Sequence, residues 1–388
     1  MKRKLLIAFV LVVAAGAAVF FFVVPGVVER SYNAVLRAPP YEASPRAREL
    51  HRRLFVADMH ADTLLWDRDL LARGARGHVD LPRLVEGGVA LQFFTVVTKA
   101  PRGMNIERTS GDTDNVTPLV ISQRWPARTW RSLTERALHQ ARRLAEAEAR
   151  SSGRLRVVRT AGDLAGFVER RRREPQAVAA LLGVEGAHAL DGRLENLGAL
   201  FDAGVRMMAP THFFDNEWGG SAHGVAKGGL TPSGRELIRA MEARGMIVDL
   251  AHASAETAKD VLAVATRPVV VSHTGVRGTC DNSRNLSDEE VRAVAATGGV
   301  IGVGFWETAT CGTDARAIAR AARHVAEVAG VRHVALGSDF DGAVATPFDA
   351  TGLVQVTDAL LAEGFNEEEV ALIMGGNVAR LLAETLPR

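Results

Sequence analysis

Polar side chains of the kinds that bind metal ions interrupt an apolar run early in the chain. The stretch LFVADMHADTLL, residues 54–65, carries Asp58, His60 and Asp62 at alternate positions. In a β-strand, side chains at i and i+2 point to the same face, so the three groups would converge on one side. Because buried polar groups are costly unless they are hydrogen-bonded or bind an ion, the spacing predicts that a partner faces this strand.

Other imidazoles and carboxylates follow later apolar runs in the same way. Taken singly, each has an ordinary explanation as turn chemistry or a helix cap. The later members are Glu185, His212, His252, His273 and Asp339. With His60 and Asp62 they make four imidazoles and three carboxylates. Burying this set around one cavity without a cation would be very costly, so we predict a metal site.

The types of these side chains narrow the choice of metal. Imidazole and carboxylate without thiolate favour zinc, followed by other first-row divalent ions. The set is too large for one tetrahedral ion, and it suits two ions that share a bridging carboxylate. We therefore expect two Zn²⁺ ions per chain.

Polar residues outside this pattern receive more ordinary interpretations. Asp58 and Asp341 flank the predicted ligands, and we expect each to orient a ligand through a hydrogen bond. Six histidines lie in helical or loop contexts and are given no catalytic role: His78, His139, His188, His223, His324 and His333.

Eight apolar runs alternate with segments of helical periodicity. The runs cover residues 54–60, 89–97, 177–186, 205–212, 246–252, 268–274, 298–305 and 333–340. Helices are predicted over 195–204, 233–245, 255–265, 288–298 and 315–330. This alternation is typical of a parallel sheet covered by helices. Eight such units favour a (β/α)8 TIM-type barrel. In such a barrel the predicted ligands would all lie at the C-terminal ends of the strands. An open doubly wound sheet is the alternative, but no Gly-rich phosphate loop follows the first strand.

One long interruption separates the second and third predicted strands. It covers roughly residues 98–175 and contains a predicted helix over 126–150 and a short strand over 154–160. We interpret it as an insertion within the barrel rather than a second domain.

The N-terminus predicts a membrane-spanning helix. The basic residues of MKRK precede 24 uncharged residues, Leu5–Val28, and about 20 apolar residues cross a bilayer as a helix. An uncleaved signal anchor is favoured over a cleaved signal peptide, whose apolar region is usually shorter. Basic residues stay in the cytoplasm, so the remainder would lie on the outer face of the cytoplasmic membrane. The predicted organisation is a spanning helix over 1–28, a Pro-bearing tether over 29–46 and a barrel domain over 47–388.

Charge and cysteine content limit the remaining functions. The formal net charge of the 388 residues is +2, and without a long basic stripe a nucleic-acid partner is disfavoured. Cys280 and Cys311 both fall in the predicted exported part. Two cysteines in an oxidising compartment permit a disulfide, but two free thiols fit the sequence equally well.

Several stretches together resemble one known family. They include ADMHADTLL, GVEGAHAL, PTHFFDNEWGGSAHG, DLAHAS, VVSHTGVRGTCDNSRNLSDEE, GSDFDG and MGGNVARLL. In this order, from about Leu54 to Leu382, the chain resembles the membrane dipeptidase (renal dipeptidase) family of zinc metallopeptidases, part of the amidohydrolase-like barrel group. The insertion around residues 98–130 does not align with the family pattern, so the resemblance leaves substrate choice undecided.

The resemblance implies a role for each predicted ligand. It implies that His60 and Asp62 bind one zinc ion and that His252 and His273 bind the other. It also implies that Glu185 bridges the two ions and so takes part in catalysis.

The resemblance also implies how a substrate is held. It implies that His212 contacts the substrate carbonyl, that Asp339 transfers a proton and that Arg284 binds the terminal carboxylate of the substrate. Without the resemblance, Arg284 would be a surface residue at a helix start. The family pattern further pairs Cys280 with Cys311 in a disulfide.

The resulting functional prediction is a binuclear zinc dipeptidase that uses a metal-bridged hydroxide. One alternative is a hydrolase of the same fold that acts on another amide or a lactam. Another is a tethered binding protein on an inactive barrel, which should have lost ligands that are present here. Dimers are common in the family, so a homodimer is a further expectation.

Overall fold

Eight parallel strands form a closed barrel at the centre of the computed structural model, which describes residues 1–388. They are β1 (Val56–Ala61), β2 (Val89–Phe94), β4 (Val178–Val184), β5 (Val205–Met208), β6 (Ile247–Val248), β7 (Val270–Thr274), β8 (Val300–Val303) and β9 (Val334–Leu336). Pairing runs in the order β6-β5-β4-β2-β1-β9-β8-β7. A parallel bridge between Asp249 and Val270 joins the two ends. This closure confirms the barrel and excludes the open sheet.

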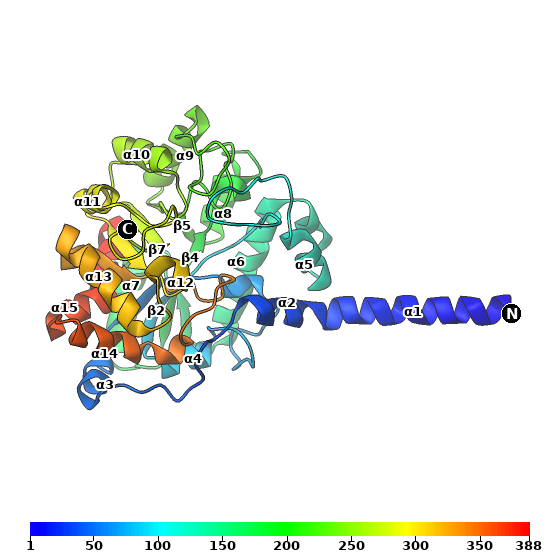
Figure 1. Ribbon diagram of the computed structural model, residues 1–388, viewed down its shortest axis with the longest axis horizontal. Helices are drawn as coiled ribbons and strands as arrows, with labels where there is room; N and C mark the ends of the chain where they lie inside the picture. Colours follow the sequence, from blue (N-terminus) through cyan, green and yellow to red (C-terminus); the bar gives the residue numbers. More distant parts are fainter.

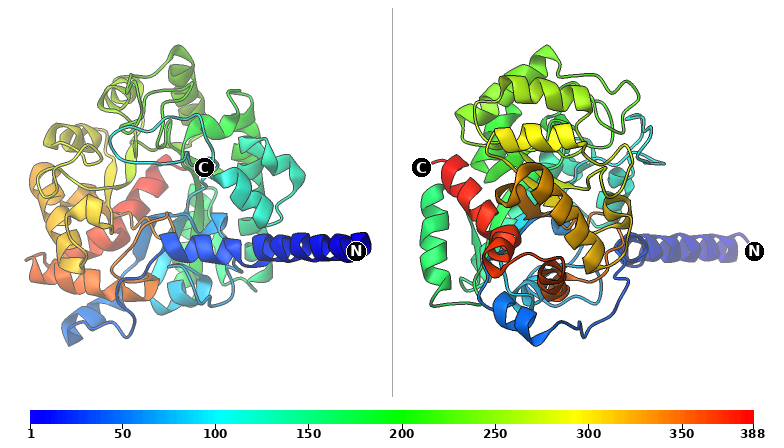
Figure 2. Two further views of the ribbon diagram at one scale, coloured as in Figure 1. Left: turned by 45° about the vertical axis from the view of Figure 1, so that its right-hand side comes forward. Right: turned by 60° about the vertical axis from the view of Figure 1, so that its left-hand side comes forward.

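Helices surround the barrel, as Figures 1 and 2 show. The outer helices after β4 are α8 (Asn196–Asp202), α9 (Pro232–Ala243), α10 (Ala255–Val264), α11 (Asp288–Ala296), α12 (Glu307–Thr310), α13 (Ala315–Ala329), α14 (Val354–Ala362), α15 (Glu367–Ala371) and α16 (Asn377–Thr385). All five helices predicted from periodicity are present. Serine residues cap two of these helices, since the Ser254 and Ser287 hydroxyls each accept a hydrogen bond from a backbone N–H in the first turn.

Two apolar layers hold the barrel together. The larger, a cluster of 67 buried residues, includes strand residues such as Val56 and Ile301 and helix residues such as Leu237 and Val325. A second cluster of 19 buried residues includes Phe93 of β2 together with residues of α16. Burial of apolar area contributes about 25 cal/mol per Å² to the free energy of folding. This contribution is the main driving force that brings the strands, and therefore their ends, into register.

The insertion between β2 and β4 contains more elements than the sequence predicts. It holds α5 (Val116–Ser122), η2 (Ala127–Trp130), α6 (Leu133–Arg150), β3 (Leu155–Val157) and α7 (Ala161–Arg171). The helix predicted over 126–150 is therefore wrong at its start. The Ser132 hydroxyl accepts a hydrogen bond from the Glu135 N–H and caps a helix that begins at Leu133. The predicted short strand is confirmed as β3, which pairs with β4.

The N-terminal helix projects from one side of the barrel (Figures 1 and 2). It consists of α1 (Lys2–Phe22) and α2 (Val24–Tyr32), and together they form the single helix that is long and apolar enough to cross a membrane. No residue of α1 is buried. The lead-in helix, α3, covers Pro45–His51.

The segment predicted as a tether is not a free linker. Glu29 of α2 is 1% exposed and forms ion pairs with Arg68 and Arg76. Further along, the Asn33 side-chain oxygen accepts a hydrogen bond from the Ala343 N–H. The Pro-bearing composition of this segment carries no information about these distant partners. The domain boundaries at residues 28 and 46 stay predictions.

Replacing Glu29 should loosen α2 from the barrel. Removing one partner from a buried ion pair costs about 3–5 kcal/mol because the remaining charge is left uncompensated. We expect Glu29→Ala to accelerate amide hydrogen exchange of α2 in the detergent-solubilised chain. Arg30→Ala, which changes the exposed neighbouring residue, is the matched control and should leave exchange unchanged. Equal exchange in both variants would contradict a docked helix.

Candidate metal centre

The predicted ligands gather at the C-terminal ends of the barrel strands, where barrel enzymes build their active sites. His60 lies in β1, His273 lies in β7, and Asp62 and Glu185 directly follow β1 and β4. The other three follow β5, β6 and β9 by a few residues: His212, His252 and Asp339. All seven side chains are buried.

Unusual backbone conformations help to position several of these groups. His252 and Asp339 have φ angles of 63° and 61°, a region that few non-glycine residues occupy and that is enriched at functional sites. Gly186, with φ 97°, follows Glu185, and a Cβ atom there would lie 2.4 Å from Cε1 of His188. Glycine is therefore required for the chain to turn directly after Glu185.

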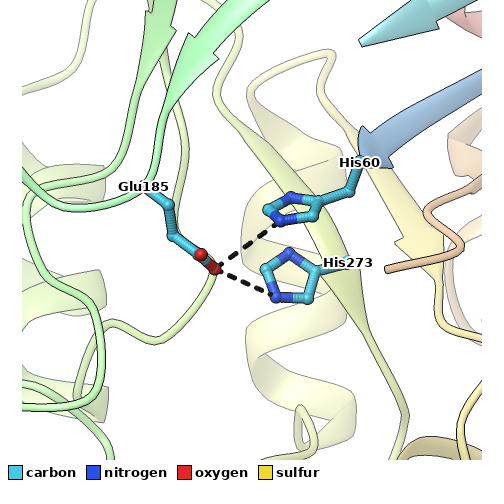
Figure 3. A group of neighbouring side chains, drawn as sticks. All are labelled: His60, Glu185 and His273. Carbon is cyan, nitrogen blue, oxygen red and sulfur yellow. Dashed lines mark ion pairs between the residues drawn. The ribbon is translucent and has the colours of Figure 1, made fainter. Parts of the chain in front are cut away.

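The Glu185 carboxylate lies at the centre of the cluster. Its Oε1 atom is 2.9 Å from Nε2 of His252, 3.4 Å from Nε2 of His273 and 3.6 Å from Nε2 of His60. Its Oε2 atom is 3.3 Å from Nε2 of His212. Figure 3 shows the carboxylate pointing toward the His60 and His273 rings. One carboxylate thus faces imidazoles that come from four different strands.

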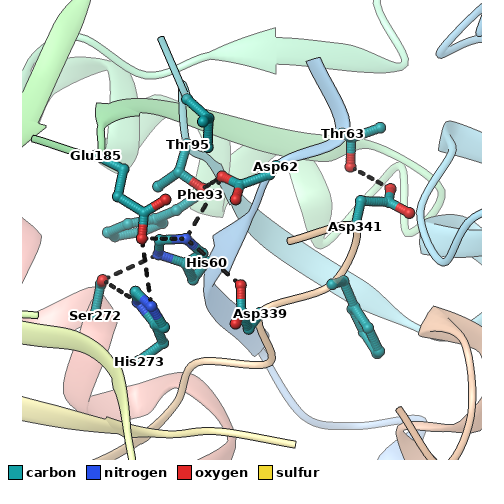
Figure 4. Close-up of polar contacts among 12 residues, drawn as sticks. His60, Asp62, Thr63, Phe93, Thr95, Glu185, Ser272, His273, Asp339 and Asp341 are labelled. Atoms are coloured by element: carbon teal, nitrogen blue, oxygen red, sulfur yellow. Dashed lines mark hydrogen bonds and ion pairs between the residues drawn. The ribbon is translucent and has the colours of Figure 1, made fainter. Parts of the chain in front are cut away.

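Two further carboxylates also face the Nε2 atom of His60. Its Nε2 atom is 3.5 Å from Oδ1 of Asp62 and 3.9 Å from Oδ1 of Asp339. The Thr95 hydroxyl donates a hydrogen bond of 2.6 Å to Asp62 and fixes that carboxylate (Figure 4). The ligand atoms of His60, Asp62 and Asp339 lie within 4.8 Å of one another, as do those of His60, Glu185 and His273.

Ser272 orients two of the imidazoles at once. Its Oγ atom lies 3.0 Å from Nδ1 of His60 and 3.0 Å from Nδ1 of His273. A hydroxyl oxygen has two lone pairs and can accept from both rings. If both Nδ1 atoms carry the proton, both Nε2 atoms are left unprotonated, which is the form that binds a metal.

His223 sets the orientation of His252 through a chain of hydrogen bonds. Its Nδ1 atom lies 3.0 Å from the carbonyl oxygen of Ile106, which can only accept, so Nδ1 is the donor. The Nε2 atom of neutral His223 is then an acceptor, and it lies 3.0 Å from Nδ1 of His252. His252 therefore donates through Nδ1 and keeps Nε2 free. Because burial lowers the pKa of His223 to about 3, the neutral form is the one present.

The sequence interpretation, which gave His223 no catalytic role, missed its contact with the predicted ligand His252. The residue comes from the Gly-rich stretch GGSAHG, and its partner Ile106 comes from the insertion. No local pattern links these two segments. The only signal in the sequence was the closeness of a histidine to a loop rich in glycine.

The charges of the site favour a bound cation. Burial and then repulsion from Asp62 raise the pKa of Glu185 well above its usual value. Burial raises the pKa of Asp339 to about 8. In addition, the Nε2 atoms of His252 and His273 are only 2.9 Å apart, and two unprotonated nitrogens at this distance repel each other. A divalent ion removes both difficulties, so the donor set fits a metal.

Arg284 is buried rather than exposed at a helix start. Its guanidinium donates to the His273 carbonyl at 2.8 Å and to the Thr274 hydroxyl at 3.3 Å, and it lies 5.5 Å from the ring centroid of Trp306. A disulfide between Cys280 and Cys311 braces the segment that carries Arg284. The predicted disulfide is confirmed, and the surface interpretation of Arg284 is wrong.

Asp58 and Asp341 do not orient the predicted ligands. Asp58 accepts hydrogen bonds from Gln92 and Ser338. Asp341 accepts from Thr63 and Arg68, away from the cluster in Figure 4. The pairing of β1 with β2 shifts register after Asp58, so the alternation that placed the three residues on one face does not continue to the strand end.

Comparison with known proteins identifies relatives of this fold and sequence. A family model described as membrane dipeptidase (peptidase family M19) matches residues 44–386. Uncharacterized dipeptidase C965.12 of Schizosaccharomyces pombe is 30% identical over 375 residues, which are 90% of this chain and 85% of that protein. Dipeptidase aclJ of Aspergillus oryzae is 34% identical over 233 residues, 55% of each protein. A metallopeptidase from Rhodobacter sphaeroides, solved with a phosphinate mimic of the dipeptide L-Ala-D-Ala, has a TM-score of 0.68 at 24% identity, covering 86% of this chain and 99% of its own.

Removing the His223 imidazole should weaken metal binding. Loss of a group that orients a ligand typically costs roughly 10- to 100-fold in metal affinity. We expect this loss of affinity for a divalent metal ion in His223→Ala, measured by competition with a chelator. His223→Gln should restore much of the affinity, since its amide can donate to Ile106 and accept from His252. His324→Ala, a change at a distant histidine, should match the wild type. Wild-type affinity in His223→Ala would contradict the orienting role.

Proposed function

Because the chain belongs to the membrane dipeptidase family (peptidase family M19) and is therefore a metallopeptidase, we propose that it is a zinc dipeptidase with two ions per chain. The observation that carries this proposal is the position of Glu185, which faces four imidazoles at the mouth of the barrel. A dipeptide substrate is supported by the Rhodobacter sphaeroides structure, whose ligand mimics a dipeptide.

Five residues would hold the two ions. His60 and Asp62 would bind one ion, His252 and His273 would bind the other, and Glu185 would bind both. Their nitrogen and oxygen donors, without thiolate, suit zinc. When bound, the ions polarise the scissile carbonyl and bring the pKa of water toward neutrality. Hydrogen bonds with Ser272, Thr95 and His223 hold the ligands in the orientation that this requires.

Asp339 is the proposed proton carrier. Peptide hydrolysis needs a group that takes a proton from the attacking water and gives it to the leaving amine. The Asp339 carboxylate is free for this role, because its oxygens take part in no hydrogen bond within the chain, while Oδ1 lies 3.9 Å from Nε2 of His60. It therefore borders the metal ligands without being fixed by a protein donor.

His212 and Arg284 are proposed to bind the substrate. The His212 ring directs its Nε2 atom toward Glu185, 3.3 Å from Oε2, so the imidazole borders the space in which a substrate carbonyl would lie. A donor aimed at the developing oxyanion lowers the barrier. Arg284 keeps further N–H groups beyond the two that His273 and Thr274 accept. A guanidinium can bind a carboxylate through two parallel hydrogen bonds, which would restrict substrates to short peptides with a free C-terminus.

We also propose that α1 anchors the enzyme in the cytoplasmic membrane with the barrel on the outer face. The basic residues of MKRK precede the apolar helix, and such residues stay on the cytoplasmic side. The disulfide between Cys280 and Cys311 agrees with an oxidising compartment.

Changing a metal ligand or the proton carrier should remove activity in distinguishable ways. We expect His252→Ala to lose both dipeptide hydrolysis and zinc, measured by amino-acid release and by metal analysis of the purified protein. Asp339→Asn should keep its zinc while its kcat falls by roughly 10²- to 10⁴-fold, the range for loss of a general acid–base group. Normal turnover by either variant would contradict the proposed dipeptidase mechanism.

The choice of substrate separates the proposed function from its alternative. A panel of L,L- and L,D-dipeptides together with a β-lactam should be tested on the zinc-loaded chain. Turnover of the lactam without turnover of any dipeptide would favour the hydrolase of another amide. His324→Ala serves as the control variant, because this histidine pairs with Asp288 outside the cluster.

Arg284→Ala should chiefly weaken substrate binding. A hydrogen bond to a charged group contributes about 1.5–3 kcal/mol, so we expect KM to rise roughly 10- to 100-fold while zinc content is unchanged. A dipeptide amide, which lacks the terminal carboxylate, should be a poor substrate for the wild type and should be affected little by the substitution. An equal loss on both substrates would show that Arg284 does not bind the carboxylate.

A further inference from the structure

The base of α1 packs against the insertion. Both α1 and α2 contact α5. The Arg124 guanidinium, just after α5, lies 4.8 Å from the ring centroid of Phe22 at the end of α1. Val28 of α2 packs on the apolar cluster that contains Trp125. Figure 1 shows α5 beside the base of the projecting helix. The insertion is therefore held at the level of Phe22 along the helix axis.

The length of α1 places this level at the membrane surface. The uncharged part of α1 covers residues 5–22 and ends at the packed base. At about 1.5 Å per residue it is roughly 27 Å long, which is close to the hydrocarbon thickness of about 30 Å. If α1 spans the bilayer, the outer boundary of the hydrocarbon falls at Phe22. Arg124 then lies at the depth of the lipid headgroups.

The barrel is held close to this boundary rather than swinging on a linker. Glu29 pairs with Arg68 and Arg76 within two turns of the end of α1. Arg68 also pairs with Asp341, directly beyond the last barrel strand. This continuous set of buried contacts fixes the direction in which α1 leaves the barrel, and it therefore fixes which face of the barrel meets the membrane.

The surface at this level has the composition of a membrane interface. Residues 115–134 contain three arginines, Arg124, Arg128 and Arg131, and no acidic residue. Trp130 is 41% exposed, whereas the other four tryptophans are buried. Tryptophan is enriched at the depth of the headgroups, and arginine binds phosphate oxygens. Arg128 forms an ion pair with Glu135, and Arg124 lies 3.6 Å from Asp67. Of the three arginines, Arg131 is therefore the one that forms no ion pair.

We infer that residues 124–131, hereafter the interfacial segment, lie against the phospholipid headgroups of the outer leaflet. This inference rests on the proposed anchoring by α1 and goes beyond it, because it states which face of the enzyme meets the membrane. Trp130 and Arg131 are the contact residues, and anionic phospholipid is the favoured partner because lysine and arginine near a surface each contribute about 1 kcal/mol of attraction to it.

Quenching of tryptophan emission by lipid tests the contact. The full chain is reconstituted into vesicles of phosphatidylcholine and phosphatidylglycerol, with or without a phosphatidylcholine that carries a nitroxide on its headgroup. We expect the nitroxide lipid to quench the intrinsic emission of the wild type and to quench Trp130→Phe much less, because the remaining tryptophans are buried. Equal quenching of the two proteins, or none in either, would overturn the inference.

A label on each side of the molecule provides the matched comparison. A fluorophore attached at Arg131→Cys should be quenched by the same lipid. The same fluorophore at Glu368→Cys on α15, which lies opposite α1 in Figure 1, should not be. Flotation of the vesicles separates this inference from the proposed anchoring. A chain that does not float with the vesicles overturns both, whereas a chain that floats with both labels equally quenched overturns the orientation alone.

Discussion

The burial of charge around Glu185 is the constraint on which the rest of the site depends. Its carboxylate faces four imidazoles and is repelled by Asp62, and in an interior of low dielectric such a group is costly unless a cation accompanies it. The hydrogen bonds around Glu185 are consistent with a site that binds a cation. The Ser272 Oγ atom lies 3.0 Å from Nδ1 of both His60 and His273, and Nε2 of His223 lies 3.0 Å from Nδ1 of His252. With Nδ1 held in this way, the Nε2 atom of each of the three rings faces the carboxylate.

The insertion between β2 and β4 connects parts of the molecule that would otherwise be independent. One end supplies the Ile106 carbonyl that sets the tautomer of His223. Further along, α5 and Arg124 pack against the base of the N-terminal helix. A partly buried ion pair between Arg136 of α6 and Asp114 links the segment before α5 to α6. The same segment therefore contributes to the metal site and to the way the helix leaves the barrel.

A network of buried ion pairs docks α2 on the barrel. Asp341 lies two residues beyond the proposed proton carrier Asp339, yet it pairs with Arg68, which also binds Glu29 of α2. Arg68 and a hydrogen bond from His78 lower the pKa of Asp341, against the effect of its burial. A residue that the sequence assigns to the metal site by proximity thus acts in docking the N-terminal helix, because its side chain turns away from the cluster.

The sequence by itself determined the barrel, its insertion and the seven polar residues at the strand ends, because hydrophobic periodicity and strand-end position are local properties that any barrel of this kind imposes. Only the tertiary structure decided which residues contact one another at the site. Asp58 lies outside the metal site because a register shift in β1 breaks the alternation of side chains. His223 lies in the site because the Ile106 carbonyl, 117 residues away in the chain, accepts a hydrogen bond from it. Arg284 became buried because the segment after β7 folds back over Trp306. Such contacts depend on where the chain returns in space, which no local pattern of residues specifies.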